Sequence, residues 1–318
     1  MNLSQITSLE WWGAVAQDFV WKIRPPDRLE STSSTWPIDP ERLADVSVIW
    51  PSEYEWLPSR LWVESLRRGL SRHVQVEHSW IPQPYPGIVL IQIRNRGGSQ
   101  DVALDYSDYP QVNQACAARC SLYFKMQFHC SGEVPAHVLP GGFVPFRNDL
   151  YRLLPHIRRL ADRREYSYDV YGRFGAEFAR DIRSKACSLL ANQNYFRWEG
   201  SLHTKSYPLS LQEIARSKIC IDLPGSGDFC FRLIDYMAVG ACIIARRHKA
   251  TLHVPLVDGE HIVYAREDLS DLVDLCRFYL ENEEAREALR RNSRAYFDRY
   301  LHRDQLAGYY LHECLKVM

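Results

Sequence analysis

The sequence predicts an α/β protein with two domains, and three observations support this. The chain has 318 residues, more than one hydrophobic core usually organises. Short apolar runs alternate with helical patterns along most of its length, which is typical of parallel sheets covered by helices. Three prolines and three glycines at residues 131–145 interrupt this alternation, so we expect the domain boundary there.

Four segments follow from these patterns. We expect an N-terminal helical arm and loop at residues 1–40, a first α/β domain at residues 41–135, a second at residues 141–300, and a final helix at residues 301–318. Four apolar residues of the arm recur at helical spacing: Trp12, Val15, Ala16 and Phe19. The arm should therefore dock on the protein or, as an alternative, on a membrane surface.

Each domain has its own series of expected elements. In the first, strands are predicted at residues 46–50, 74–76, 88–93, 102–104 and 122–126, and a helix at residues 61–70. In the second, strands are predicted at residues 168–171, 196–198, 219–223, 241–245 and 261–264, and helices at residues 150–164, 176–190, 211–215 and 229–239. Residues 269–316 should be almost wholly helical, with a break near residues 301–304. We expect a parallel sheet in the first domain and an open, doubly wound sheet in the second.

Composition and charge exclude several classes of protein. The 39 basic and 39 acidic residues cancel, so no overall field would draw the chain to nucleic acid or to an anionic membrane. Glu10 and Asp18 interrupt the most apolar part of the N-terminus, which argues against a signal peptide. No later segment has the ~20 apolar residues of a membrane span. Because the nine cysteines are scattered, we read them as reduced thiols and expect a cytoplasmic protein, with peripheral membrane contact as an alternative.

The most informative stretch is a glycine turn between a strand and a helix. The apolar strand at residues 219–223 ends in Pro-Gly-Ser-Gly, and an apolar helix at residues 229–239 follows. Gly225 and Gly227 would let backbone N–H groups approach a ligand closely, and the start of the helix adds partial positive charge. This combination predicts a phosphate-binding turn.

Two charged side chains follow the turn on the same helix. Arg232 is placed to reach a diphosphate, and Asp235, three residues later, to accept hydrogen bonds from ribose hydroxyls. The alternative is that they form an ordinary surface pair. The helix is apolar on most of its sides, so charges on it need a reason, and this favours the ligand-binding interpretation.

Residues 222–245, and above all residues 231–240 (FRLIDYMAVG), resemble the signature of GT-B glycosyltransferases, in particular the group 1, exostosin-like and protein O-glucosyltransferase-like families. Those families place Arg and Glu three apart before a small-residue helix end, whereas this chain has the shorter Asp235. The resemblance covers about residues 140–318. It implies two Rossmann-like domains that face each other across a cleft, with the C-terminal helix crossing back onto the N-terminal domain.

The same resemblance implies a reaction. A hexosyltransferase-like enzyme would move a sugar from a nucleotide-diphosphate sugar, held chiefly by the second domain, to a hydroxyl acceptor. Fixed positive charge would stabilise the departing diphosphate in place of a metal. The nucleotide-sugar is a substrate, with a UDP-sugar favoured, and no cofactor is expected. A glycan, a lipid-linked saccharide or a protein could be the acceptor, and the sequence carries no signal for an oligomeric state.

The residues expected to bind the donor come mainly from the resemblance. They are Arg173 in the turn at residues 169–175, Gly225, Ser226 and Gly227 of the glycine turn, and Phe231, Arg232 and Asp235 of the following helix. Lys205 precedes the helix that leads to the turn and is a further candidate, with a solvated surface lysine as the alternative. Lys125 and Arg147 lie near the expected cleft and have the same two interpretations.

An inverting enzyme also needs a base for the acceptor hydroxyl. Asp105 and Asp108, at the end of a predicted strand, are the expected catalytic carboxylates, with Glu53 as a second choice and turn capping as the alternative. Two carboxylates three residues apart also raise the question of a metal. We expect no metal site, because a hard cation usually needs more oxygen ligands.

Three other functions remain open from the sequence. The glycine turn followed by Arg246 and Arg247 would suit an NADP-dependent oxidoreductase, although Cys230 occupies the place of the third glycine. A basic strip would suit a sugar transferase acting on modified DNA bases: Arg152, Arg158, Arg159, Arg163 and Arg164. The third is a catalytically inactive homologue that serves as a scaffold.

Overall fold

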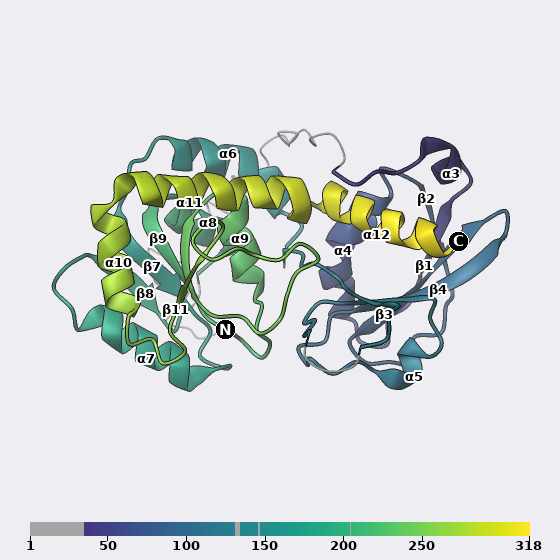
Figure 1. The fold of residues 1–318 in the computed structure, drawn as a ribbon, viewed down its shortest axis with the longest axis horizontal. Coiled ribbons are helices and arrows are strands. Elements are labelled where there is room, and N and C mark those ends of the chain that lie inside the picture. Colours follow the sequence, from purple (N-terminus) through teal and green to yellow (C-terminus); the bar gives the residue numbers. More distant parts are fainter. Residues whose placement is uncertain (1–34, 131–133, 146, 204) are drawn as a thin grey trace, which may run out of the picture.

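Two α/β domains lie side by side, each built on one sheet (Figure 1). The computed structural model describes residues 35–130, 134–145, 147–203 and 205–318. Most of the expected N-terminal arm, including its four apolar residues, lies outside the described residues. Within the part described, the chain begins with the short helix α3 (Pro40–Ala44).

The sheet of the first domain has six strands in the order β2-β1-β3-β4-β5-β6. The strands are β1 (Ser47–Pro51), β2 (Gln75–Ser79), β3 (Ile88–Asn95), β4 (Gly98–Asp105), β5 (Leu122–Lys125) and β6 (Val138–Pro140). The helices are α4 (Ser59–Leu70) and the short α5 (Gln114–Ala117). Because β6 pairs with β5, the sheet extends past residue 135, where we expected the domain to end.

The prediction that the first sheet is wholly parallel is wrong. Strand β3 is antiparallel to both β1 and β4, while the other pairs are parallel. The register pairs Asn95 with Gly98, so only Arg96 and Gly97 connect β3 to β4. A two-residue connection can form a hairpin but cannot carry the crossover that parallel strands require. Arg96 and Gly97 therefore form the turn of a β-hairpin.

The sheet of the second domain is parallel and doubly wound, as expected, in the order β11-β10-β9-β7-β8. Its strands are β7 (Tyr168–Arg173), β8 (Trp198–Ser201), β9 (Ser217–Asp222), β10 (Cys242–Arg246) and β11 (Val263–Ala265). Its helices are α6 (Leu150–Asp162), α7 (Arg180–Ala191), α8 (Tyr207–Ala215), α9 (Phe231–Val239) and α10 (Leu272–Glu281). The strand order reverses direction between β7 and β9, and crevices at such points commonly bind ligands.

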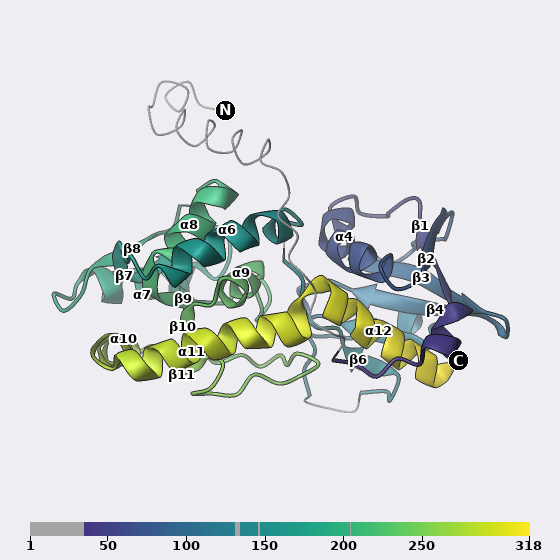
Figure 2. The same ribbon diagram turned by 90° about the horizontal axis from the view of Figure 1, so that it is seen from above.

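The C-terminal helices join the two domains, as the resemblance implied. Helix α11 (Glu283–Tyr296) lies over the second domain, continues through a short π-helix (Phe297–Leu301) and leads to α12 (Arg303–Val317), which packs along α4 of the first domain (Figures 1 and 2). The expected break falls at His302. Gly69 of α4 lies against the Arg303 backbone, where an added Cβ would overlap the carbonyl. Glycine at this position lets the two helices approach closely.

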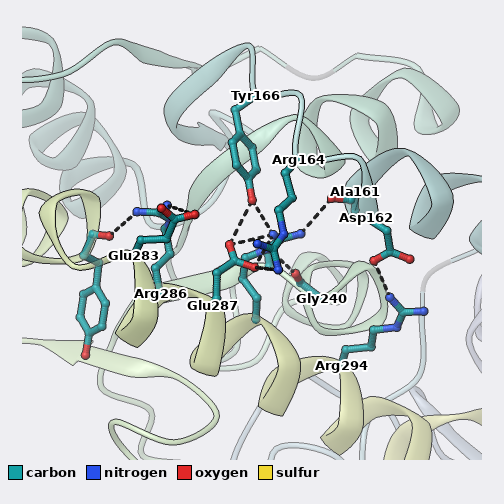
Figure 3. A network of polar contacts seen from close by, with 12 residues as sticks. Ala161, Asp162, Arg164, Tyr166, Gly240, Glu283, Arg286, Glu287 and Arg294 are labelled. Atoms are coloured by element: carbon teal, nitrogen blue, oxygen red, sulfur yellow. Dashed lines mark hydrogen bonds and ion pairs between the residues drawn. The ribbon is translucent and has the colours of Figure 1, made fainter.

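A buried polar network fixes the end of α9, the helix that follows the glycine turn (Figure 3). The Arg290 side chain donates from Nε to the Gly240 carbonyl (3.1 Å) and from Nη2 to the Ala161 carbonyl (3.3 Å). These carbonyls end α9 and α6, where helices leave acceptors unsatisfied. Glu287 pairs with the same guanidinium at 3.0 Å and accepts a hydrogen bond from Tyr166. Helix α9 is thus anchored to α6 and α11 at the end away from the turn.

Candidate functional site

The glycine turn lines a pocket between the two sheets, which we call the interdomain pocket. Its volume is about 350 Å³. Both domains contribute to its wall: Asp108, Pro110, Gln127 and His129 from the first, and Ala179, Ile182, residues 224–228 and Arg246 from the second. The turn follows β9 directly, so the pocket lies at the carboxyl ends of the strands of the second sheet.

The turn itself is closed by a hydrogen bond from the Gly225 N–H to the Gly227 carbonyl (3.0 Å). A Cβ added at Gly227 would overlap the side-chain amide of Gln127 in the first domain. At Gly225 a Cβ would lie 3.0 Å from the Cys230 sulfur. The turn therefore needs glycine because neighbouring groups approach its backbone from both domains.

Helix α7 begins at the interdomain pocket, where Ala179 and Ile182 form part of the wall. One turn into this helix, the Arg183 side chain is buried beneath the glycine turn and only 4% exposed. It donates to the Pro224 carbonyl (2.9 Å) and to the Gly175 carbonyl (2.7 Å). Among the described residues, no carboxylate forms an ion pair with it. Burial and the nearby Arg232 guanidinium lower the pKa of Arg183, as expected for a cation without a charged partner.

Arg232 lies deeper in the second domain than expected and does not line the interdomain pocket. It forms an ion pair with the fully buried Asp222 at 3.1 Å and donates to the Leu223 carbonyl at 2.7 Å. Its guanidinium also lies over the ring of Phe174, 4.7 Å from the centroid. The surface-pair interpretation is wrong, because Asp235 is buried, the Arg232 side chain is only 18% exposed, and the two have separate partners.

Asp235 accepts a hydrogen bond from the Tyr207 hydroxyl (2.7 Å) and is 8% exposed. Burial raises its pKa to about 7, although Tyr207 and Arg232 act in the opposite direction. The carboxylate does not line the interdomain pocket, so the structure gives no contact for the expected ribose role. Phe231 also lies away from this pocket, with its ring centroid 5.2 Å from that of Phe143.

Arg173 and Lys205 are engaged by acidic side chains. Arg173 donates from Nε to Glu213 (2.9 Å) and pairs with Glu199. Lys205 pairs with the same Glu213 at 2.5 Å. Neither cation lines the interdomain pocket, so the expectation that they contact a donor there has no support in this geometry. Sequence reasoning could not anticipate Glu213 as their shared partner.

The two expected catalytic carboxylates have different environments. Asp105 is 1% exposed and accepts hydrogen bonds from Tyr123 and from Lys125 (2.8 Å). Asp105 therefore has a structural role, because its carboxylate accepts hydrogen bonds from buried side chains. Asp108 lines the interdomain pocket and is hydrogen-bonded to Ser226 of the glycine turn. The surrounding protein removes part of its water, and this desolvation raises the pKa of Asp108.

Of the expected residues, the structure brings together Asp108, Gly225, Ser226 and Gly227 around the interdomain pocket. Glu53 is exposed on the loop after β1 and is not part of its wall, and Arg147 pairs with Asp149 at the surface. Four residues near the turn were not predicted from the sequence: Gln127, His129, Arg183 and Asp228. Arg246, which also lines the pocket, was considered only for the NADP-dependent alternative. Of the four, Asp228 directly follows the turn and was the easiest to find.

A second pocket adjoins the first, and we call it the neighbouring pocket. It has a volume of about 420 Å³ and belongs wholly to the first domain. Its wall consists of Pro110, Gln111, Val112, Gln114, Lys125, Phe128, His129, Val134 and Pro135. Pro110 and His129 line both pockets.

Within the described ranges, no group of three or more His, Cys, Asp or Glu side chains could hold a metal ion. None of the helices in the described part of the chain has the length and apolar character needed to cross a membrane.

A family model described as "Glycosyl transferase-like" matches residues 152–310, which is half of the chain. The chain belongs to this glycosyltransferase family. The matched region contains the glycine turn, helix α9 and most of the second domain, so the family resemblance expected from residues 222–245 is confirmed. Glycosyl transfer is thereby favoured over the oxidoreductase alternative.

Two solved structures are similar to the chain. One is the C-terminal domain of a group 1 family glycosyl transferase (LpcC) from Francisella tularensis, with 12% sequence identity and a TM-score of 0.31, covering 44% of this chain and 89% of the other. The second is a glycosyltransferase from Rickettsia africae, with 15% identity and a TM-score of 0.32, covering 52% of this chain and 43% of the other. No curated protein matches the sequence.

Two arginines of the basic strip that suggested a DNA-acting enzyme form ion pairs within the protein. Arg158 is buried, donates to the Ala238 carbonyl (2.7 Å) and pairs with Asp298. Arg164 pairs with Glu287 at 3.2 Å. These arginines hold helices together, and such charges are not free to contact phosphates.

Proposed function

We propose that this glycosyltransferase moves a sugar from a nucleoside-diphosphate sugar to a hydroxyl acceptor, and that the diphosphate binds in the interdomain pocket. The observation that carries the proposal is Arg183, a buried guanidinium beneath the glycine turn that forms no ion pair with a described carboxylate. Burying such a charge is costly unless something compensates it. Arg183 lies behind the wall of the pocket rather than in it, so an anion bound against the turn would supply the compensation through the electric field and not by direct contact.

The charges beneath the turn support this assignment. Two guanidiniums, Arg183 and Arg232, lie there with one buried carboxylate, Asp222, so the group carries net positive charge. The start of α7 faces the same pocket and adds partial positive charge, and the backbone of the glycine turn can approach a phosphate. The pocket wall itself carries Asp108, Asp228 and Arg246, so the net positive charge lies beneath the turn, where the fold fixes it. Fixed positive charge is what stabilises charge that develops on a leaving diphosphate.

These charges also underlie the proposal that catalysis needs no metal. Where a metal cation would otherwise neutralise the departing diphosphate, the start of α7 at the pocket wall and the Arg183 charge behind it would stabilise the negative charge. Nine free cysteines, with no disulfide, are consistent with a reducing compartment, and we propose a cytoplasmic location on that basis.

A screen with UDP-, GDP-, ADP-, CMP- and dTDP-sugars tests the donor class, with thermal stabilisation as the first measurement and calorimetry as the second. A UDP-sugar is our first choice. Arg183→Gln should weaken binding of the stabilising donor by about 10- to 100-fold, because the positive charge behind the turn is lost. Lys185→Gln, an exposed change on the same helix, is the matched control.

Because Arg183 also holds two carbonyls, Arg183→Lys provides a second variant that keeps the charge. It should bind the donor more tightly than Arg183→Gln. Circular dichroism and unfolding without ligand show whether each variant is folded. Unchanged donor affinity in a folded Arg183→Gln variant would contradict the proposed site, and absence of binding by the wild type to every donor would contradict the proposed donor class.

A further inference from the structure

The two pockets share a wall that holds one group able to take a proton. Pro110 and His129 line both the interdomain pocket and the neighbouring pocket, and proline has no proton-accepting side chain. This inference rests on the proposed function, in which the donor occupies the interdomain pocket. An acceptor hydroxyl entering from the neighbouring pocket would then meet the sugar beside His129.

His129 belongs to the first domain, but a carboxylate of the second domain lies against it. Its Nε2 is 3.5 Å from Oδ2 of Asp228. That carboxylate oxygen is fixed by two backbone N–H donors, from Lys249 (2.7 Å) and Ala250 (2.8 Å). His129 and Ala250 are themselves paired as an antiparallel bridge. The relative positions of imidazole and carboxylate are therefore set by backbone contacts on both sides.

This geometry selects a protonation state of the ring. With Nε2 toward Asp228, the neutral imidazole is favoured with its proton on Nε2, and Nδ1 keeps a lone pair. A carboxylate beside a histidine also stabilises the imidazolium that forms when Nδ1 takes a proton. These are the two properties of a general base oriented by a carboxylate.

We propose that His129 is the base that deprotonates the acceptor hydroxyl and that Asp228 is its positioning residue. Nδ1 takes the hydroxyl proton as the acceptor oxygen bonds to the anomeric carbon. The bond from that carbon to the diphosphate oxygen breaks, and its electron pair leaves with the nucleoside diphosphate. The imidazolium then returns the proton to solvent. A single displacement of this kind inverts the anomeric configuration.

Asp108 is the rival base, and two observations favour His129 over it. Asp108 lines the interdomain pocket but not the neighbouring pocket, and its carboxylate is hydrogen-bonded to Ser226 of the glycine turn. His129 lines both pockets. A base must reach the acceptor and the reacting carbon together, which only the shared wall permits.

The neighbouring pocket indicates the class of acceptor. Gln111 and Gln114 supply amides that both donate and accept hydrogen bonds, and Phe128 supplies an aromatic ring. Among the described residues that line it there is no carboxylate, and Lys125 is already paired with Asp105. Amides beside an aromatic ring suit the hydroxyls and apolar faces of a sugar, so the acceptor we assign to this pocket is a saccharide.

The first experiment measures nucleoside diphosphate release from the donor found in the screen, with water and with methyl glycosides as acceptors. His129→Ala should lower the rate by about 10²-fold or more and weaken donor binding less than Arg183→Gln does, although His129 lines the donor pocket. Added imidazole should restore at least part of the lost rate. His78→Ala, an exposed change on β2, is the control. A smaller loss than in Asp108→Asn, or a product of retained configuration, would overturn the proposal.

Asp228→Asn tests the positioning role through the pH profile. The rate should fall less than in His129→Ala, and the acidic limb of the profile, where protonation of the base removes activity, should move to lower pH, because loss of the carboxylate favours the neutral ring. The other charged groups that line the two pockets are Asp108, Arg246 and Lys125, and none of them changes in this variant. Asp274→Asn, exposed on α10, is the control. An unmoved profile would contradict the role of Asp228.

A measurement that needs no turnover separates failure of this inference from failure of the proposed function. Nuclear magnetic resonance of histidine-labelled protein, with His129→Gln to assign the signal, reports which ring nitrogen of His129 carries the proton. The proton should lie mainly on Nε2 in the wild type, and Asp228→Asn should reduce that preference. An unchanged tautomer in Asp228→Asn overturns the pair whether or not a donor has been found. A changed tautomer with no donor binding would support the pair and leave the donor class as the part that fails.

Discussion

The side-chain amide of Gln127, in the first domain, forms hydrogen bonds with both backbone groups of Phe229, in the second. Nε2 donates to the Phe229 carbonyl at 3.0 Å, and Oε1 accepts from the Phe229 N–H at 3.1 Å. Gln127 is 1% exposed, so these bonds form away from water. Because Phe229 directly follows the glycine turn, one side chain both joins the domains and fixes the backbone beside the interdomain pocket.

Replacing Gln127 with alanine should destabilise the junction of the domains. Two buried backbone groups would lose their partners, at a cost of about 1–3 kcal/mol each. Urea denaturation measures the loss, with the exposed change Gln75→Ala as the control. Gln127→Glu should also destabilise, because a carboxylate cannot donate to the Phe229 carbonyl. Stability equal to the wild type in both variants would show that water replaces these bonds without cost.

Gly227→Ala should impair donor binding more than Gly225→Ala. The new Cβ at Gly227 would overlap the Gln127 amide, whereas at Gly225 it would lie 3.0 Å from the Cys230 sulfur and 3.4 Å from Arg183. Overpacking of this kind typically costs about 1–3 kcal/mol. Gly175→Ala, with its nearest neighbour at 3.8 Å, should be tolerated. Calorimetry with the donor would give the order of the three variants, and equal affinities would contradict the close approach of the domains.

The parts of the site that follow from local sequence could be predicted, and those that depend on distant partners could not. The glycine turn was found because strand, turn and helix are consecutive in the chain. Gln127 approaches the turn from about a hundred positions away, and no local pattern marks it. Arg173 looked free because its partner Glu213 is distant in sequence. The alternation of strands and helices also gave no sign of the hairpin at Arg96-Gly97, because the pattern of apolar residues does not reveal the direction of a strand.

The ion-pair partner of Arg232, Asp222, was likewise not predicted from the sequence. Substitution of Arg232 should act mainly on stability. Removing the guanidinium would leave Asp222 buried without its ion-pair partner, which typically costs about 3–5 kcal/mol. Asp222→Asn should also destabilise the protein, because it leaves the Arg232 guanidinium without its ion-pair partner. In the double variant Asp222→Asn with Arg232→Gln, the loss should be smaller than the sum of the single losses. Urea denaturation of all four proteins gives the coupling energy, and additive losses would show that the pair is not coupled.

The buried carboxyl group of Asp235 should make folding stability depend on pH. Its pKa is about 7 in the folded protein and near 3.8 when unfolded, because burial disfavours the charged form. Between these values the folded state holds a proton that the unfolded state has lost. The free energy of unfolding therefore falls as pH rises through this range, by on the order of 3 kcal/mol from this group. Asp235→Asn removes the titrating group and retains an acceptor for Tyr207, so the stability of this variant should depend less on pH.

Urea denaturation at pH 5 and at pH 7.5 compares the wild type with Asp235→Asn, with Asp274→Asn as the exposed control. If the wild type and Asp235→Asn lose the same free energy between these pH values, Asp235 is ionised throughout and its burial is compensated by a charge in the folded state.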